Sequence, residues 1–206
     1  TWPVPIYASS MSVYGDVPDE PVHESNTCRP LSFYGVGKLA SEHYLRIYKT
    51  KGLQPTSLRI FNVYGPGQNL SNLRQGMVSI FLAQMLKDQQ IVVKGTLDRF
   101  RDFIYIDDVV RLTIELMNNG KSVGGIYNIG SGVKTTVKQL LNKLQNIYGK
   151  NVKLLFSDPT PGDQQGITAD INLLKNDLVF GGLIPLNDGI NKMIGWAKTV
   201  QKGQIK

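Results

Sequence analysis

The sequence of 206 residues contains a single cysteine, Cys28, and has no long apolar run. One cysteine cannot form an internal disulfide, and such sparing use is typical of proteins in a reducing compartment. Apolar stretches such as residues 91–93 and 104–106 are far too short to cross a bilayer. No basic segment followed by an apolar one marks a signal peptide, although a chain without its natural start could not show one. We therefore expect a cytoplasmic protein with no membrane partner.

The charge balance is positive, with 23 Lys and Arg against 16 Asp and Glu and a formal net charge of +7. Proteins that bind nucleic acid gather such residues in a stripe with interleaved aromatics, whereas here they are dispersed along the chain. A modest positive excess also suits an enzyme that handles an anionic diphosphate. We therefore expect no nucleic-acid partner.

Residue types that ligate metals are few and scattered. His23 lies in a polar loop, and His43 is an isolated helix residue with no partner at ligand spacing. Asp107 and Asp108 are adjacent carboxylates, but they directly follow a predicted strand, where Asp107 is expected to cap a helix. We therefore predict no metal site.

Apolar periodicity predicts strands and helices that alternate along the chain. A strand at residues 5–10, a helix at 34–50 and a strand at 56–61 form a crossover of the kind found in parallel sheets. Further helices are predicted at 77–87, 108–117 and 135–148, with shorter ones near 172 and 188, and further strands at 91–94, 103–106, 125–129 and 152–156. The predicted fold class is α/β.

Tyr34 and Lys38 form a Tyr-x-x-x-Lys pair at the start of the first predicted helix. Residues four apart share a helix face, and a fixed positive charge near a phenol favours the phenolate. The hydroxyl of Ser9 or Ser10 ends a parallel strand, where such folds bind ligands. Together these groups can remove a proton from a sugar alcohol while hydride leaves the same carbon. On spacing alone, an unremarkable surface helix explains the pair better.

The context of the pair changes this interpretation. Blocks occur in order at 7–15 (YASSMSVYG), 30–38 (PLSFYGVGK), 58–67 (LRIFNVYGPG), 101–109 (RDFIYIDDV), 127–130 (YNIG) and 161–163 (PGD). They resemble the SSxxVYG, PxSxYxxxK, LRxFNVYGPG and RDFIYVDDV motifs of the extended short-chain dehydrogenase/reductase family. Within it, the chain is similar to the NAD-dependent epimerase/dehydratase members of the UDP-glucose 4-epimerase type.

The resemblance implies an incomplete Rossmann-type parallel sheet and a smaller α/β substrate-binding domain. Residues 1–65 would form the second part of the NAD-binding domain, and residues 104–132 would return to it. Residues 66–103 and 133–206 would form the sugar-nucleotide-binding domain. The resemblance also implies NAD as cofactor, a nucleotide-diphosphate sugar such as UDP-hexose as substrate, and a homodimer.

Individual residues acquire roles by the same resemblance. The catalytic set is Ser10, Tyr34 and Lys38, in which Ser10 bridges the tyrosine and the sugar hydroxyl. The cofactor-binding set is Ala8, Ser9, Tyr34, Lys38 and Phe61. The substrate-binding set is Ser10, Asn62, Arg101, Asp163 and Ile167. The planar, permanently charged fork of an arginine such as Arg101 suits two phosphate oxygens.

The chain departs from the family pattern in three ways. The Gly-rich turn that sets the dinucleotide pyrophosphate on a helix N-terminus is absent, and the first predicted strand begins within the first few residues. We therefore expect the upstream part of the NAD-binding domain to be missing. Thr160 stands where relatives often carry an arginine, so one diphosphate contact is in doubt. Lys94 stands where relatives often place an aromatic residue against the base.

The residues after Ser10 narrow the chemistry. Dehydratase and decarboxylase relatives carry carboxylates there, whereas this chain has Met11 and Ser12, which do not titrate near neutral pH. We therefore predict a UDP-hexose 4-epimerase that acts by transient C4 oxidation on tightly bound NAD. A sugar-nucleotide reductase or dehydratase of the same family stays open. So does a non-catalytic fragment, because the pyrophosphate site is missing.

Ile167 matches the position that gates the 2-substituent of the hexose in 4-epimerase relatives, counted from Asp163 to Asp170. An aromatic residue there would fill the space of an N-acetyl group. Isoleucine keeps a stiff, β-branched wall but removes the ring. The sequence therefore predicts that N-acetylhexosamine is accepted as well as plain hexose.

Overall fold

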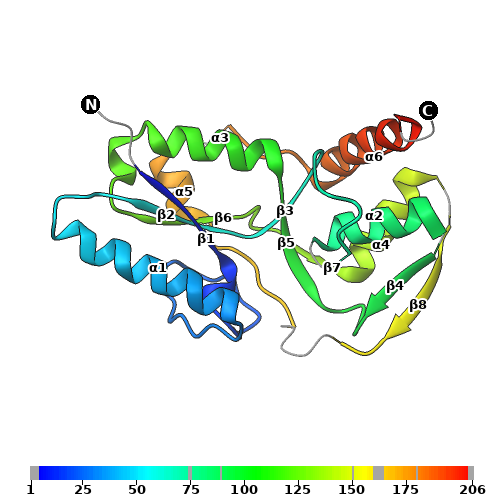
Figure 1. Cartoon of the computed structure of the whole chain (residues 1–206), viewed down its shortest axis with the longest axis horizontal. Helices are drawn as coiled ribbons and strands as arrows, with labels where there is room; N and C mark the ends of the chain where they lie inside the picture. Colours follow the sequence, from blue (N-terminus) through cyan, green and yellow to red (C-terminus); the bar gives the residue numbers. More distant parts are fainter. Residues whose placement is uncertain are drawn as a thin grey trace.

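The computed structural model describes residues 5–73, 76–88, 90–149, 151–159, 165–179 and 181–203. These residues form two parts that lie side by side, on the left and right of Figure 1. The first part is a parallel sheet in the order β1-β2-β6. Its strands are β1 (Ile6–Ser10), β2 (Thr56–Ile60) and β6 (Ile126–Ile129). Helix α1 covers one face, and α3 and α5 cover the other (Figure 1); they span Phe33–Lys49, Ile106–Met117 and Asn172–Asp177.

The second part is built on a two-stranded parallel sheet of β4 (Gln90–Lys94) and β8 (Lys153–Ser157). Three helices pack beside it, namely α2 (Met77–Asp88), α4 (Val137–Tyr148) and α6 (Leu186–Gly203). A third sheet, in the order β3-β5-β7, connects the two parts. Its strands are β3 (Asn62–Tyr64), β5 (Phe100–Tyr105) and β7 (Lys134–Thr136), and two short 3-10 helices complete the set, η1 (Met11–Val13) and η2 (Gly120–Ser122).

The crossover predicted from the sequence is confirmed, because β1, α1 and β2 follow one another and the two strands pair in parallel. The register runs from Ile6 opposite Thr56 to Ser10 opposite Ile60. It places the carboxyl ends of both strands at the same edge of the sheet, where open α/β sheets bind their ligands. The family blocks around Ser10 and Phe61 therefore meet at this edge.

Each part has its own apolar core. The first is a cluster around Leu58, Leu112 and Ile129, between the sheet and α3. The second is larger and is formed mainly by α2, α4, α6 and the inner side of β4. Leu174 of α5 belongs to the first cluster, although the sequence assigned residues 133–206 to the other domain. None of the helices in the described ranges is long and apolar enough to span a membrane.

Two helix starts test the capping predictions. The sequence offers Thr135 or Thr136 as the cap of α4; the cap is Thr136, and a reciprocal bond from Gln139 completes a capping box. The prediction for Asp107 is wrong: Tyr105 occupies the cap position of α3 and makes no side-chain cap bond. The helix begins two residues earlier than expected, so both aspartates lie in its first turn, where they suit the positive end of the helix dipole. Asp108 is used elsewhere, accepting a hydrogen bond from Ile184 N at 2.8 Å.

Candidate functional site

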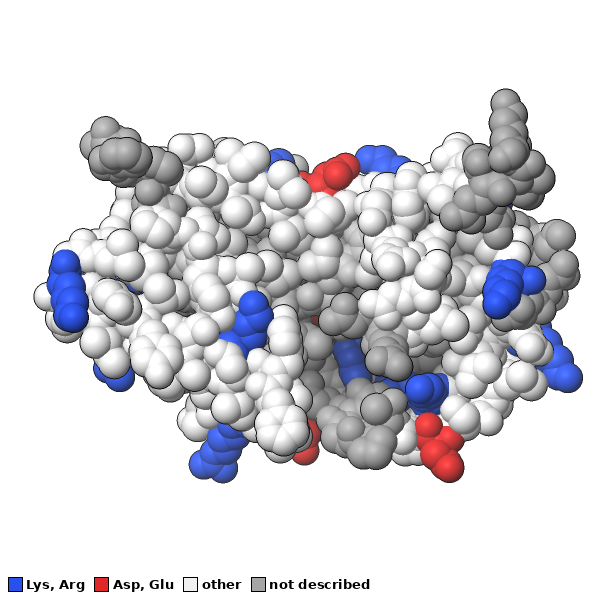
Figure 2. All heavy atoms as spheres, in the orientation of Figure 1, with Lys and Arg blue, Asp and Glu red and all other residues white. Residues whose placement is uncertain are grey.

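An open cavity of about 360 Å³ lies at the carboxyl ends of β1 and β2. Ser10, Tyr34 and Lys38, the predicted catalytic set, all line it. Among the other residues that line it are Ala8, Ser9, Phe61, Asn62, Gln68 and Gly76. Lys and Arg side chains are dispersed over the face shown in Figure 2, and some of them lie at a hollow between the two parts. The fold thus gathers side chains from segments that are far apart in the sequence.

Tyr34 and Lys38 are presented by the first two turns of α1. Ser32 caps this helix by accepting a hydrogen bond from Gly35 N at 3.0 Å. Lys38 Nζ donates to the carbonyl of Ala8 at 2.7 Å and lies 5.5 Å from the centre of the Tyr34 ring. The Tyr34 side chain is 57% exposed, and its hydroxyl makes no hydrogen bond to the described part of the chain. The phenol is therefore available to a ligand and has a cation beside it.

Ser10 is held at the end of β1, where its hydroxyl accepts a hydrogen bond from Ser12 N at 3.2 Å and so caps η1. Helix α1 meets η1 at very close range, because a Cβ added to Gly35 would lie 2.4 Å from the carbonyl oxygen of Ser12. Only glycine permits this approach without a shift of the backbone. The contact brings the start of α1, and Tyr34 with it, against the segment that carries Ser10.

Phe61 and Asn62 line the cavity directly after β2. Phe61 N donates to the carbonyl of Ile129 at 2.9 Å, which continues the pairing between β2 and β6. The Asn62 amide donates to the carbonyl of Asp102 at 3.1 Å and also approaches the sulfur of Met11. The backbone at both positions is thus fixed by strand pairing rather than by a loose loop.

The predicted diphosphate residue Arg101 lies on β5 and is buried, and it is not among the residues that line the cavity. Its guanidinium donates to the carbonyl of Phe100 at 2.7 Å. Burial and the nearby charge of Arg99 lower the pKa of Arg101 to about 10, so the side chain stays charged at neutral pH. The sequence did not single out Arg99, which is also buried. Two buried guanidinium groups therefore lie close together at this end of β5.

The structure brings none of the remaining substrate predictions that it describes to the cavity. Asp163 and the departure at Thr160 lie outside the described residues. Ile167 is 1% exposed and packs in an apolar cluster with Val13 and Phe61, and it does not line the cavity. Lys94, at the end of β4, is exposed, and its place against the base of the substrate is implied only by the family resemblance. The gating role of Ile167 stays a prediction.

Asp102 is a buried carboxylate that the sequence showed only as part of the RDFIYIDDV block. It accepts hydrogen bonds from three backbone N–H groups, those of Ser131 at 2.7 Å, Gly132 at 2.9 Å and Ala169 at 3.0 Å. Burial raises the pKa of Asp102, and these hydrogen bonds oppose the rise. The carboxylate therefore ties β5 to the loop before β7 and to the segment around residue 169.

Gln68 is a site residue that the sequence analysis missed. Its side-chain oxygen is buried and has no hydrogen-bond partner in the described part of the chain. Gln68 also lines a second hollow of about 590 Å³, between the segment 68–73, α2 and α6, which contains none of the predicted site residues. Its only signal in the sequence is its place directly after the Gly-Pro-Gly turn. The described residues hold no cluster of three or more His, Cys, Asp or Glu that could bind a metal.

Comparison with known proteins identifies the family. Residues 3–130 match the sequence profile of the NAD dependent epimerase/dehydratase family. A putative UDP-glucose 4-epimerase from Methanocaldococcus jannaschii is 32% identical over 195 residues, with 94% of this chain and 62% of that protein covered. A dTDP-4-dehydro-6-deoxyglucose reductase from Escherichia coli is 36% identical over 192 residues, with 92% of this chain and 60% of that protein covered.

The fold has the same relatives. The crystal structure of UDP-glucose 4-epimerase from Thermotoga maritima, solved with UDP-glucose, superposes with a TM-score of 0.89 at 32% identity. The match covers 95% of this chain and 63% of that one. This chain belongs to the NAD dependent epimerase/dehydratase family, as its motifs predicted. It spans about 62% of the length of the first of these curated relatives.

Proposed function

We propose that the protein containing this chain is an NAD-dependent nucleotide-sugar epimerase, and that its substrate is a UDP-hexose epimerised at C4. The observation that carries the proposal is the convergence of Ser10, Tyr34 and Lys38 on one cavity. Met11 and Ser12 form η1 directly after Ser10, so neither supplies the carboxylate that an elimination of water would use. The relatives with epimerase names support the same activity.

The side chains can perform the proton transfer that this reaction requires. The Tyr34 phenolate oxygen takes the proton of a sugar hydroxyl, and the Lys38 ammonium beside it stabilises the negative charge that this oxygen carries before the proton arrives. Ser10 can hydrogen-bond the same sugar hydroxyl and orient it toward the phenol. Because both partners are held by the fold before a ligand arrives, little reorganisation is needed when the proton moves.

The residues at the cavity also fit the nicotinamide end of NAD. The Tyr34 hydroxyl has no partner among the described residues, and Lys38 uses one of its three donors on Ala8, so donors and acceptors are available for ribose hydroxyls. Ala8, Ser9 and Phe61 would form the wall beside the ring. When bound, NAD takes a hydride from the sugar carbon and later returns it. The pyrophosphate contacts of the cofactor have no counterpart among the residues described.

The nucleotide of the substrate would lie toward β5. Asn62 lines the cavity and is bonded to the backbone of Asp102, which directly follows Arg101 on β5. We propose that Arg101, with Asp163, contacts the diphosphate and that Ile167, which lacks an aromatic ring, leaves room for an N-acetyl group as the 2-substituent of the sugar. Comparing kcat/KM on UDP-glucose with that on UDP-N-acetylglucosamine tests the last point, because an enzyme that rejects the N-acetyl sugar contradicts it.

We propose a homodimer through α1. This helix exposes the side chains of Phe33, Val36, Tyr44 and Ile47, and Phe33 is 99% exposed. Their spacings of three, eight and three residues put them on one face, and an exposed apolar face of this kind is typical of an interaction surface. The single cysteine supports the further proposal that the protein works in the cytoplasm.

The decisive variant is Tyr34→Phe in the complete protein loaded with NAD. Removing the hydroxyl should lower kcat for interconversion of UDP-glucose and UDP-galactose by roughly 10²- to 10⁴-fold, the usual contribution of a general acid–base group. Tyr48→Phe is a matched control, because this tyrosine lies on the same helix, is exposed and belongs neither to the cavity nor to the proposed dimer face, and it should leave kcat unchanged. Wild-type epimerisation by Tyr34→Phe would disprove the assignment.

A reductase is the second candidate, because the Escherichia coli reductase is 36% identical and the same three side chains can serve a net hydride transfer. Net consumption of reduced nicotinamide cofactor with a 4-keto sugar nucleotide, without epimerisation of UDP-glucose, would favour it. If the chain instead acts as a binding fragment, it should bind UDP-sugars without turnover. Submicromolar binding of NAD by this chain alone would argue against the fragment.

A further inference from the structure

Helix α1 carries two of the three catalytic side chains, yet it is barely buried. Of its seventeen residues, only Gly35 and Glu42 are buried. A helix of this length usually docks through a stripe of apolar side chains. Here the stripe faces outward, so the position of α1 against the sheet depends on a few specific contacts. Gly35 fixes how closely the helix approaches, Leu39 packs half-buried against the apolar cluster of Val13 and Phe61, and Glu42 is the one buried side chain of the helix that makes directional bonds.

Glu42 lies one turn beyond Lys38 and two turns beyond Tyr34, so the three side chains share one face. One carboxylate oxygen accepts a hydrogen bond from the hydroxyl of Ser9 at 2.5 Å and another from Arg59 Nε at 3.1 Å. The other oxygen accepts from Arg59 Nη2 at 2.7 Å. The carboxylate therefore joins α1 to both β1 and β2, and its β1 partner is the residue next to Ser10.

Arg59 is itself held from the opposite side. Its remaining nitrogen donates to the carbonyl of Glu24 at 2.9 Å, and its guanidinium lies 4.8 Å from the centre of the Tyr14 ring. The pKa of Arg59 is raised above its ordinary value. Burial alone would lower this pKa, but the hydrogen bond to Glu42 and the contacts with Tyr14 raise it by more, so the side chain stays charged.

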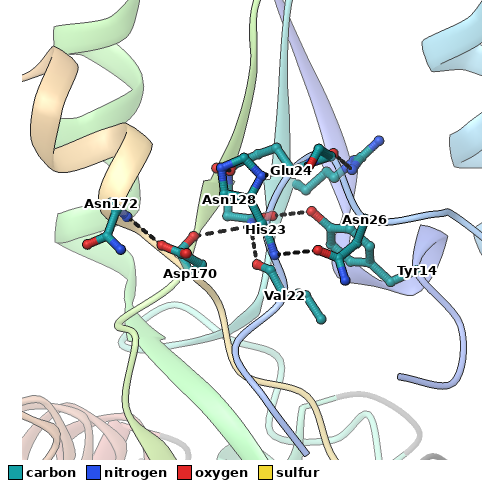
Figure 3. Close-up of polar contacts among 10 residues, drawn as sticks. Tyr14, Val22, His23, Glu24, Asn26, Asn128, Asp170 and Asn172 are labelled. Atoms are coloured by element: carbon teal, nitrogen blue, oxygen red, sulfur yellow. Dashed lines mark hydrogen bonds and ion pairs between the residues drawn. The ribbon is translucent and has the colours of Figure 1, made fainter. Parts of the chain in front are cut away.

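Tyr14 connects Arg59 to strand β6. Burial raises the pKa of Tyr14 to about 12, so its hydroxyl stays protonated and donates to the side-chain oxygen of Asn128 at 2.6 Å. Asn128 in turn donates to the carbonyl of Val22 at 2.8 Å (Figure 3). The Ser9–Glu42–Arg59 contact is thus one end of a continuous chain of polar contacts across the sheet.

We infer that Glu42 is a positioning residue, which through Ser9 and Arg59 fixes the register of α1 on the sheet so that Tyr34 and Lys38 face Ser10. The inference rests on the proposed function of these three residues. Stability alone does not account for the arrangement, because a buried ion pair can often be replaced by apolar side chains without loss of stability. Positioning does account for it, because hydrogen bonds are directional. Apolar packing tolerates small displacements that hydrogen bonds at 2.5–3.1 Å do not.

The test uses the complete, NAD-loaded protein with the double replacement Glu42→Leu/Arg59→Met. Removing both charges avoids an unpaired buried ion, so the fold should survive with a melting temperature near that of the wild type. The bond to Ser9 is lost, and α1 can shift. A displacement of about 1 Å at a catalytic group costs roughly 10²-fold, so kcat should fall by about 10- to 100-fold while KM for the UDP-sugar changes little. Glu42→Gln keeps an acceptor for Ser9 and should recover part of kcat.

The first part of the fold offers a matched control. Asp108 on α3 is a buried carboxylate that accepts from Arg111 at 3.1 Å and from the backbone of Ile184, away from the cavity. Asp108→Leu/Arg111→Met also replaces a carboxylate–guanidinium pair by apolar side chains, but this pair lies within α3 and its arginine is partly exposed, so the variant should leave kcat unchanged. If this control lowers kcat as much as the Glu42 pair does, the effect is general loosening and the inference is wrong.

Amide hydrogen exchange gives a readout that does not depend on activity. The Glu42→Leu/Arg59→Met protein should exchange faster than the wild type in residues 33–41, while the control double variant should not. If exchange there is unchanged, or if kcat of the Glu42 pair equals that of the wild type, Glu42 does not position α1. If the wild type fails to epimerise UDP-sugars but exchange responds as expected, the proposed function fails while the positioning of α1 by Glu42 stands.

Discussion

Helices α1 and α4 lie in different parts of the molecule and are attached to it in opposite ways. Helix α4 has twelve residues and buries Val137, Leu140, Leu141 and Leu144, and a capping box fixes its start. Helix α1 is longer, with seventeen residues, but it buries one glycine and one glutamate. Apolar burial is non-directional and secures contact, whereas hydrogen bonds and a close backbone approach specify position. The helix that carries the catalytic side chains uses the second kind of attachment.

The largest expected effect comes from breaking the polar attachment on one side only. Arg59→Met leaves the buried Glu42 carboxylate without its ionic partner, which should lower the free energy of unfolding by about 3–5 kcal/mol. Urea unfolding of this variant beside Glu42→Leu/Arg59→Met checks the reason, because the double variant should be markedly more stable. Equal stability of the two would show that the unpaired charge is not the cause.

The apolar attachment should respond to a loss of volume. Leu140 of α4 is fully buried in the core of the second part, so Leu140→Ala should cost about 2–5 kcal/mol in the free energy of unfolding. Amide exchange in residues 33–41 should stay close to that of the wild type at temperatures where the protein is folded. Faster exchange of α1 in this variant would mean that the two attachments are not independent.

The close approach of α1 to η1 can be tested with two glycines of the same helix. Gly35→Ala forces a Cβ against the Ser12 carbonyl and should cost roughly 1–3 kcal/mol, because overpacking moves backbone. Gly37→Ala meets nothing within 4 Å and should stabilise the helix by up to about 1 kcal/mol through its higher helix propensity. Thermal unfolding of both variants gives the comparison. Changes of the same sign would show that space at Gly35 is not limiting.

The sequence predicted the elements whose pattern is local. The periodicity of residues 34–50 and of residues 135–148 corresponds to observed helices. The three-residue strands β3 and β7 were missed because so short a segment has no measurable alternation. Asp107 was predicted as a cap because the helix was expected to start at residue 108. The sequence shows neither that α3 starts at Ile106 nor that the Asp108 carboxylate bonds the distant Ile184.

The candidate site shows the same difference between features with a local sequence pattern and features that depend on long-range contacts. Ser10, Tyr34 and Lys38 were predicted because the chain order of the motifs is informative, and the structure places all three on the cavity. Glu42 and Arg59 are seventeen residues apart, and the sequence does not show that the crossover places them in contact. Gln68 was missed for a similar reason, because burial of a single amide oxygen depends on the packing of the whole site.

The carboxylate of Asp102 has a consequence for motion. It holds the backbone of Ser131 and Gly132 on one side and of Ala169 on the other, so two segments that are distant in the sequence share one anchor. A displacement of either segment relative to β5 must break or carry along the bonds of the other. The two segments should therefore move as one body, and a displacement of one is transmitted to the other through the side chain of Asp102.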